Sequence, residues 1–135
     1  EPINRHQPDK SDPLDVLSKV GGYEIAGIAG VILGAAYHQV PVLVVGFIST
    51  AGALIAKALC PQSLDYMITS HQSEEPGHQL MWQALGLRPL LNLNFRLGEG
   101  TGAAVAMHLV ESSARVICDV LTFADAGVTN GHEGV

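Results

Sequence analysis

The sequence has few basic residues. Seven lysines and arginines stand against thirteen aspartates and glutamates, so the formal net charge is −6. Proteins that bind nucleic acid non-specifically need clustered lysine and arginine, and this composition therefore argues against a nucleic-acid partner. It also means that a bound phosphate group would have to be held largely by backbone N–H groups.

Cysteine is nearly absent, and the two that occur have no metal-binding spacing. Cys60 and Cys118 each follow an apolar helical pattern, so we interpret both as small buried hydrophobic residues. His71 and His78 are separated by a proline and also lack the spacing of a standard metal site. We therefore expect no metal ion and no other cofactor, and the cysteine usage fits a reduced, cytoplasmic setting.

The sequence lacks an apolar run that reads clearly as a membrane span. The most apolar region, Ile25–Ala56, is interrupted by His38 and Gln39, and its first part is too short to cross a bilayer. Residues 1–20 are polar and contain three prolines, which does not resemble a secretory signal. A membrane hairpin is an alternative, but we expect no membrane partner.

Aliphatic and small residues are abundant instead. Hydrophobic residues make up 47% of the 135 positions, aromatic residues only 5%, and there are 15 glycines. This is enough for one domain with a core, in which small residues let helices and strands approach closely. The apolar patterns predict helices at 13–20, 24–38, 49–59, 77–85 and from 101 to about 107, and strands at 40–47, 64–70 and 91–97.

This alternation predicts an α/β fold with three layers, a mostly parallel sheet flanked by helices, like part of a Rossmann domain. We expect residues 1–13 to be an extended linker or docking segment, 14–128 the α/β domain, and 129–135 a flexible tail. The helix at 24–38 is apolar around nearly its whole circumference, which predicts burial on most sides, with Gly27, Gly30 and Gly34 allowing tight packing.

Ligands of open parallel sheets bind beyond the C-terminal ends of the strands. Three segments should lie there: Gly46–Thr50, Ser70–Gly77 and Gly98–Gly102. In the last of them, "GEGTG", glycines let the backbone approach a ligand, and Glu99 lies at a helix start where it could accept a proton. A strand-to-helix turn with a capping carboxylate is the structural alternative. Similarly, Ser73 could bind a ligand or serve only as a turn residue.

Several of these segments together resemble one enzyme family. They are "GGYEIAGIAGVILGAAYHQVPVLVVGFISTAGALIA", "SHQSEEPGH", "LGLRPLLNLNFRLGEGTGAAVAM" and the closing "TFADAGV". In this combination they are similar to the C-terminal portion of nicotinate-nucleotide:dimethylbenzimidazole phosphoribosyltransferases, over residues from about Asp12 to Val128.

The resemblance implies an activity and a site. Members of this family transfer phosphoribose from nicotinate mononucleotide to 5,6-dimethylbenzimidazole, which yields nicotinate and the α-ribazole 5′-phosphate of the cobalamin lower ligand. They are homodimeric, cytoplasmic enzymes without a metal requirement. The catalytic glutamate of the family matches Glu99. Leu97 would line the benzimidazole pocket, Ser73 would lie near the pyridine-derived product, and Gly98, Gly100, Thr101 and Gly102 would help to bind the ribose phosphate.

The chain departs from the family pattern in three respects. The family usually has an acid in "VDGFIS" where this chain has Val45, and "AMP" becomes "AMH" at His108. The family's chain is also more than twice as long and contains an upstream phosphate loop. We therefore expect a homodimer or a complementary N-terminal half to cover the exposed sheet edge. A binding or interaction module that keeps the scaffold without catalysis is the alternative function.

Overall fold

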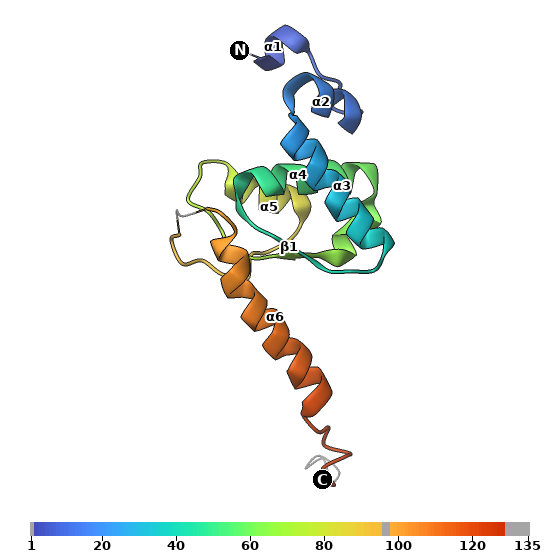
Figure 1. Ribbon diagram of the computed structural model, residues 1–135, viewed down its shortest axis with the longest axis vertical. Helices are drawn as coiled ribbons and strands as arrows, with labels where there is room; N and C mark the ends of the chain where they lie inside the picture. The colour runs from blue at the N-terminus through green and yellow to red at the C-terminus, as the bar shows by residue number, and fades with distance from the viewer. Residues whose placement is uncertain (1, 96–97, 129–135) are drawn as a thin grey trace, which may run out of the picture.

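The computed structural model describes residues 2–95 and 98–128 (Figure 1). The elements in chain order are α1 (Pro2–His6), α2 (Pro13–Val20), α3 (Tyr23–Tyr37), β1 (Val42–Val44), α4 (Gly46–Leu59), the 3-10 helix η1 (Pro61–Tyr66), β2 (Met67–Thr69), α5 (His78–Leu85) and α6 (Thr101–Asp119). The predicted α/β fold is confirmed. α1 and α6 lie at opposite ends of the long axis (Figure 1).

The sheet in the described residues consists of two parallel strands. Val42 pairs with Met67, Leu43 with Ile68 and Val44 with Thr69. Helices α3, α4 and α5 lie on one side of these strands, and α6 leads away in the opposite direction (Figure 1). Helices thus flank a small parallel sheet, in which a crossover through α4 joins β1 to β2.

The second helix begins where its capping residue predicts. The Asp12 carboxylate accepts hydrogen bonds from the amides of Leu14, at 2.9 Å, and Asp15, at 3.2 Å, and Pro13 occupies the first helical position. Proline is suited to this position because its missing N–H would have no partner there. The prediction of a helix from Pro13 to Val20, with Asp12 as its cap, is confirmed.

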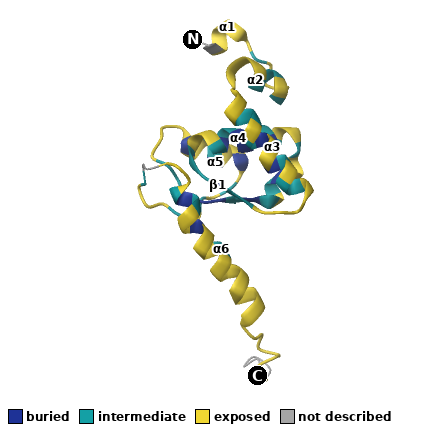
Figure 2. Cartoon of the chain, viewed as in Figure 1, coloured by how far each residue is buried: buried dark blue, intermediate teal, exposed yellow. Residues whose placement is uncertain are grey.

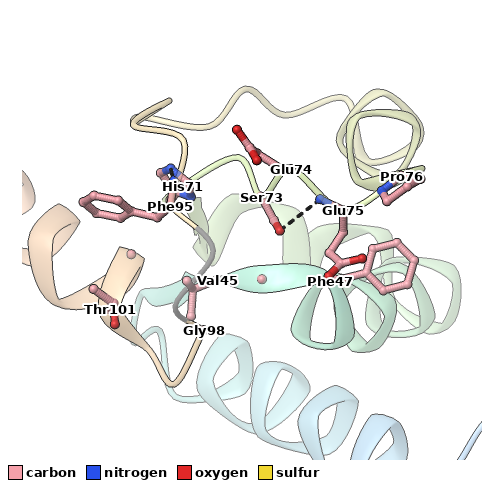
Figure 3. Close-up of a pocket in the computed structure, with 12 residues that line it drawn as sticks. Val45, Phe47, His71, Ser73, Glu74, Glu75, Pro76, Phe95, Gly98 and Thr101 are labelled. Carbon is pink, nitrogen blue, oxygen red and sulfur yellow. Dashed lines mark hydrogen bonds between the residues drawn. The ribbon is translucent and has the colours of Figure 1, made fainter.

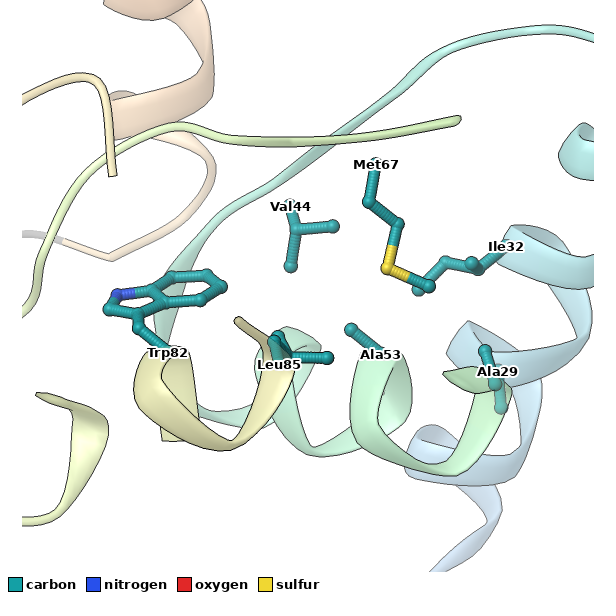
Figure 4. Packing of buried hydrophobic residues seen from close by; sticks show 8 residues of the cluster. Ala29, Ile32, Val44, Ala53, Met67, Trp82 and Leu85 are labelled. Carbon is teal, nitrogen blue, oxygen red and sulfur yellow. The ribbon is translucent and has the colours of Figure 1, made fainter. Parts of the chain in front are cut away.

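The hydrophobic core lies between the strands and helices α3, α4 and α5 (Figure 4). Val44 and Met67 point from the strands toward Ala53, Trp82 and Leu85 on α4 and α5. The buried hydrophobic cluster comprises Ala29, Ile32, Val44, Ala53, Ala56, Met67, Trp82 and Leu85. Buried residues are therefore concentrated in the middle of the molecule, whereas both ends are exposed (Figure 2).

The expectation that the helix at 24–38 is buried on most sides is wrong for the described chain. Only Ala29 and Ile32 of α3 are buried, and Tyr23 and Tyr37 are 96% and 83% exposed. The predicted glycine packing is wrong as well, because side chains added at Gly27, Gly30 and Gly34 would all meet open space. The close contact comes from Gly52 of α4, which packs against Ile28 and the backbone of Ala29.

The predicted strands are shorter than expected. Residues 40–47 yield only β1, because Val40 and Pro41 lie outside the ladder and α4 already begins at Gly46, three residues before the predicted start. Of β1, only Val44 is buried, so burial on both faces was also too strong an expectation. Residues 64–70 form the end of η1 followed by β2.

The strand predicted at 91–97 does not form within the described residues. Leu91 makes a single parallel bridge to His71, and the amides of Leu90 and Leu91 donate to Thr69 and Ser70. The backbone then leaves the extended conformation at Asn94, where φ is 55°. Arg96 and Leu97 lie outside the described residues, and so does the tail predicted at 129–135.

Three further expectations need correction. Residues 2–6 form helix α1 rather than extended backbone, and α6 continues to Asp119 instead of ending near Met107. Cys118 is exposed and Cys60 is half-buried, so neither is the buried residue that we expected. As for a membrane hairpin, none of the helices in the described part of the chain combines the length and apolarity needed to span a bilayer.

Candidate active site

A cavity of about 510 Å³ lies where the two strands end (Figure 3). All three segments that we expected at the strand ends contribute to it. Its lining residues are Val45, Gly46 and Phe47 after β1, His71, Ser73, Glu74, Glu75 and Pro76 after β2, and Phe95, Gly98, Thr101 and Gly102 at the start of α6. Sequence segments that are far apart thus meet around one space, as expected for a parallel α/β fold.

The turn before α6 has an unusual backbone. Gly98, Glu99 and Gly100 all have positive φ, at 69°, 54° and 81°. Glycine adopts this region freely, but glutamate does so at a cost of about 1 kcal/mol, and strained non-glycine residues concentrate at functional sites. The turn brings the chain directly into α6, whose first residues Thr101 and Gly102 line the cavity.

Glu99 is exposed at the rim of this cavity, between the lining residue Gly98 and the helix start. The residue at the N-cap of α6 is Gly100, and within the described residues no side chain accepts a hydrogen bond from the first amides of the helix. The structural alternative for Glu99, a capping carboxylate, is therefore not what the structure shows. The amide of Thr101 donates to the carbonyl of Gly98 at 3.1 Å, and the amide of Gly102, in the cavity wall, is open to a ligand.

Ser73 lies on the opposite wall and is half-buried. Its hydroxyl oxygen accepts a hydrogen bond from the amide of Glu75 at 3.2 Å (Figure 3). Its own amide donates to Nδ1 of His78 at 2.9 Å. The hydroxyl hydrogen of Ser73 is therefore left to donate to another acceptor, while its backbone is held from behind.

His78, the first residue of α5, is fully buried. Its Nε2 lies 2.9 Å from the hydroxyl of Thr50, which in turn donates to the carbonyl of Gly46 at 2.7 Å. The ring packs against Trp82, with 4.6 Å between the ring centres. Burial of the ring lowers the pKa of His78. This chain of hydrogen bonds connects both sides of the cavity through the protein interior.

His71 fixes a further wall of the cavity, the segment that precedes the glutamate turn. It is only 4% exposed, and its Nε2 accepts hydrogen bonds from the amides of Leu93, at 3.0 Å, and Phe95, at 3.4 Å. Its ring is stacked on that of Phe95, with 5.0 Å between the centres. Burial lowers the pKa of His71 too. The segment that leads into the glutamate turn is thus fixed by a histidine from the neighbouring strand end.

The sequence-predicted residues are therefore brought close together, with one outside the described part of the chain. Ser73, Gly98, Thr101 and Gly102 line the cavity, Glu99 and Gly100 belong to the same turn, and Leu97 is not described. Sequence reasoning missed the lining aromatics Phe47 and Phe95, and it considered His71 and His78 only as metal ligands. In the described residues, no group of three or more histidines, cysteines or acids is placed to hold a metal ion.

Comparisons with known proteins agree with this architecture. A family model described as phosphoribosyltransferase matches residues 1–128. The chain is 54% identical over 131 residues to a protein of Geobacter metallireducens, and 58% identical over 129 residues to one of Syntrophotalea carbinolica. Both are named nicotinate-nucleotide–dimethylbenzimidazole phosphoribosyltransferase, and the alignments cover 97% and 96% of this chain.

A solved structure shows the same fold. CobT from Thermus thermophilus superposes with a TM-score of 0.87 at 44% identity, over 96% of this chain and 38% of that one. The chain likewise spans only 36% of each of the two relatives. The match over residues 1–128 nevertheless includes the whole described site. The chain therefore belongs to the phosphoribosyltransferase family that this model describes.

Proposed function

We propose that this chain supplies the glutamate-bearing part of the active site of a nicotinate-nucleotide:dimethylbenzimidazole phosphoribosyltransferase. The observation that carries the proposal is the convergence of three strand-end segments on one cavity, with Glu99 at its rim. The relatives that share this region carry that enzyme name. The substrates would be small molecules, nicotinate mononucleotide and 5,6-dimethylbenzimidazole.

The reaction needs few catalytic groups. One ring nitrogen of dimethylbenzimidazole attacks C1′ of the ribose, and the bond from C1′ to the pyridinium nitrogen breaks. Its electron pair returns to the pyridine ring, which leaves as nicotinate and needs no acid because it departs from a cation. The other benzimidazole nitrogen loses its proton as positive charge develops on the ring. A carboxylate that accepts this proton is the group that the reaction requires of the protein.

The backbone around Glu99 supports that role. Its backbone has a left-handed conformation between two glycines, and Gly98 before it and Thr101 after the turn line the cavity. We assign Glu99 as the general base. The remaining rate enhancement would come from holding the two flat rings and the ribose in line.

The other predicted site residues suit binding roles. The start of α6, with Gly100, Thr101 and the open amide of Gly102, would receive the ribose phosphate, since the chain has few basic side chains to hold it. Ser73 would donate its free hydroxyl hydrogen to the nicotinate side. Leu97, which we keep as a prediction from the resemblance, would contact the benzimidazole.

A non-catalytic binding module is the second candidate, and Val45 favours it. Val45 occupies the N-cap of α4 without a side-chain hydrogen bond and lines the cavity, where the family pattern has an acid. Replacing that acid by valine removes a polar group from the site. Under this alternative, the cavity would bind benzimidazole or a nucleotide without turnover.

We further propose that the complete site needs protein that this chain does not contain. The chain spans 36–38% of its relatives, and it contains no second glycine-rich phosphate loop of the kind that the resemblance implies. A complementary N-terminal half would supply the loop, whereas a second copy of this chain would cover the exposed sheet edge. A cytoplasmic location is part of the same proposal.

The decisive test is turnover in a chimaera in which this chain replaces the matching region of the Geobacter metallireducens relative. We expect α-ribazole 5′-phosphate and nicotinate from nicotinate mononucleotide and dimethylbenzimidazole. A folded chimaera that binds both ligands in calorimetry but releases no nicotinate would reject the enzyme and support the binding module.

A further inference from the structure

We propose that His71 and His78 are positioning residues of the candidate site, each of which fixes one wall of the cavity by accepting a backbone N–H, and that they work as neutral imidazoles of opposite tautomers. The hydrogen bonds themselves do not depend on the enzyme assignment. Only the statement that these walls belong to a substrate site rests on the proposed function.

The hydrogen bonds around His78 define its tautomer. The amide of Ser73 can only donate, so Nδ1 of His78 must carry a lone pair. The single hydroxyl hydrogen of Thr50 is directed to the carbonyl of Gly46, so the Thr50 oxygen can only accept from His78. Both conditions are met by one form, the neutral ring with its hydrogen on Nε2.

His71 has the opposite requirement. Its Nε2 receives the amides of Leu93 and Phe95, so that nitrogen must carry the lone pair. A neutral ring then has its hydrogen on Nδ1. The two histidines at the ends of "HQSEEPGH" therefore differ in protonation site, although they flank the same loop.

All three amide donors lie in segments without regular structure. Ser73 belongs to the loop between β2 and α5, and Leu93 and Phe95 to the segment between α5 and α6. Such segments depend on side-chain acceptors for their backbone order, because no helix or ladder satisfies their amides. Each histidine thus accepts backbone N–H groups that no strand or helix partner accepts. His78 does so for Ser73, and His71 does so for the segment before the turn that contains Glu99.

Protonation would break both contacts. A second proton on either ring occupies the lone pair and turns the contact into one hydrogen facing another. Burial lowers the pKa of both rings, which keeps them neutral near pH 7. The titratable groups whose charge acts on His78 are Glu75, which favours the charged ring, and His71, which opposes it. The walls should therefore hold at neutral pH and loosen together on acidification.

The tautomers can be measured directly in the full 135-residue chain. With isotope-labelled histidine, the ring nitrogen and carbon shifts distinguish the two neutral forms. We expect the Nε2–H form for His78 and the Nδ1–H form for His71 at about pH 7.5, above the ordinary histidine pKa. Finding the same tautomer for both, or a charged ring for either, would overturn the proposal.

Matched substitutions test what the contacts do. Asparagine places an acceptor near the position of Nδ1, and glutamine near that of Nε2, whereas leucine offers none. Exchange of the Ser73 amide should be about five- to tenfold faster in His78→Leu than in His78→Asn, the factor that corresponds to one lost hydrogen bond. The Leu93 amide should respond in the same way to His71→Leu and His71→Gln.

The pH profile separates positioning from general stability. In the unmodified chain, exchange of the Ser73 amide, corrected for its intrinsic pH dependence, should accelerate as pH falls below about 6.5. In His78→Asn it should stay flat, since asparagine does not titrate. If exchange in His78→Asn still accelerated on acidification as it does in the unmodified chain, the proposal would be overturned. Failure of the chimaera to turn over with these tautomers intact would reject the proposed function alone.

Discussion

Gly102 lies directly against His71. A Cβ built on Gly102 would stand 2.7 Å from the Cβ of His71 and 2.9 Å from Cγ2 of Val45. Neither contact involves the far end of a flexible side chain, so an added methyl group would have to displace α6 or a strand end. The absence of a side chain at Gly102 therefore sets how closely the helix that follows Glu99 approaches the sheet.

Gly102→Ala should accordingly lower the free energy of unfolding by about 1–3 kcal/mol, the usual cost of overpacking. Thermal or urea unfolding followed by circular dichroism measures this. The control is Gly34→Ala on α3, where an added Cβ meets open space. There, alanine should increase stability by up to about 1 kcal/mol through helix propensity. Equal losses in the two variants would contradict the packing argument.

Lys57 should stabilise the helix that carries His78 and Trp82. Its Nζ donates to the carbonyls of Ala84, at 2.7 Å, and Leu85, at 3.2 Å, at the C-terminal end of α5. Lys57→Met keeps most of the alkyl chain and removes both bonds, so we expect a loss of about 1–2 kcal/mol in unfolding free energy. Lys10→Met, at an exposed position before α2, should change it by less than about 0.5 kcal/mol. An unchanged free energy of unfolding in Lys57→Met would contradict this role.

The stability of the chain should depend on pH through the two buried histidines. Burial lowers the pKa of His71 and His78 in the folded state, so the unfolded state binds more protons below the ordinary histidine pKa of about 6.5. Their contribution is complete above that pH and is lost as pH falls below it. Urea unfolding between about pH 7.5 and 5 should show this decline, and His71→Gln/His78→Asn should flatten it. A decline of equal slope in the double variant would assign it to other groups.

Val45 offers a position for gaining stability. It is the N-cap of α4 and makes no side-chain hydrogen bond there, whereas aspartate and asparagine are preferred caps. Val45→Asp and Val45→Asn should each stabilise the chain by about 0.5–1 kcal/mol in thermal unfolding. Turnover of the chimaera should rise only with Val45→Asp if an acid beside Glu99 assists it. The same rise with Val45→Asn would assign the effect to the helix start alone.

Local signals in the sequence were sufficient for most helices. Asp12 and Pro13 mark the start of α2, and Gly86 marks the end of α5. α6 runs past the predicted end because residues 108–119 contain neither glycine nor proline. These features act within one helical turn, so they can be recognised in the sequence alone.

Long-range contacts could not be predicted from local sequence signals. The alternation of residues 91–97 predicts a strand, but the amides of Leu93 and Phe95 go to a histidine ring instead of a strand partner. Similarly, the paired histidines of "HQSEEPGH" were visible, but the hydroxyl that fixes His78 comes from Thr50, 28 residues earlier. The clustering of the strand-end segments could be predicted, because it follows from parallel topology alone. The side-chain hydrogen-bond acceptors that order each wall of the cavity could not be predicted in this way.

The central claim is that Glu99 accepts a proton from the benzimidazole ring. Its most direct test is the kcat of the chimaera with Glu99→Gln, which keeps the size of the side chain and removes its basicity, beside Glu111→Gln, an exposed carboxylate further along α6. We predict that Glu99→Gln lowers kcat by about 10²–10⁴-fold, the usual contribution of a general base, and that Glu111→Gln leaves it unchanged. A Glu99→Gln chimaera that retains the kcat of the unmodified one would contradict the account.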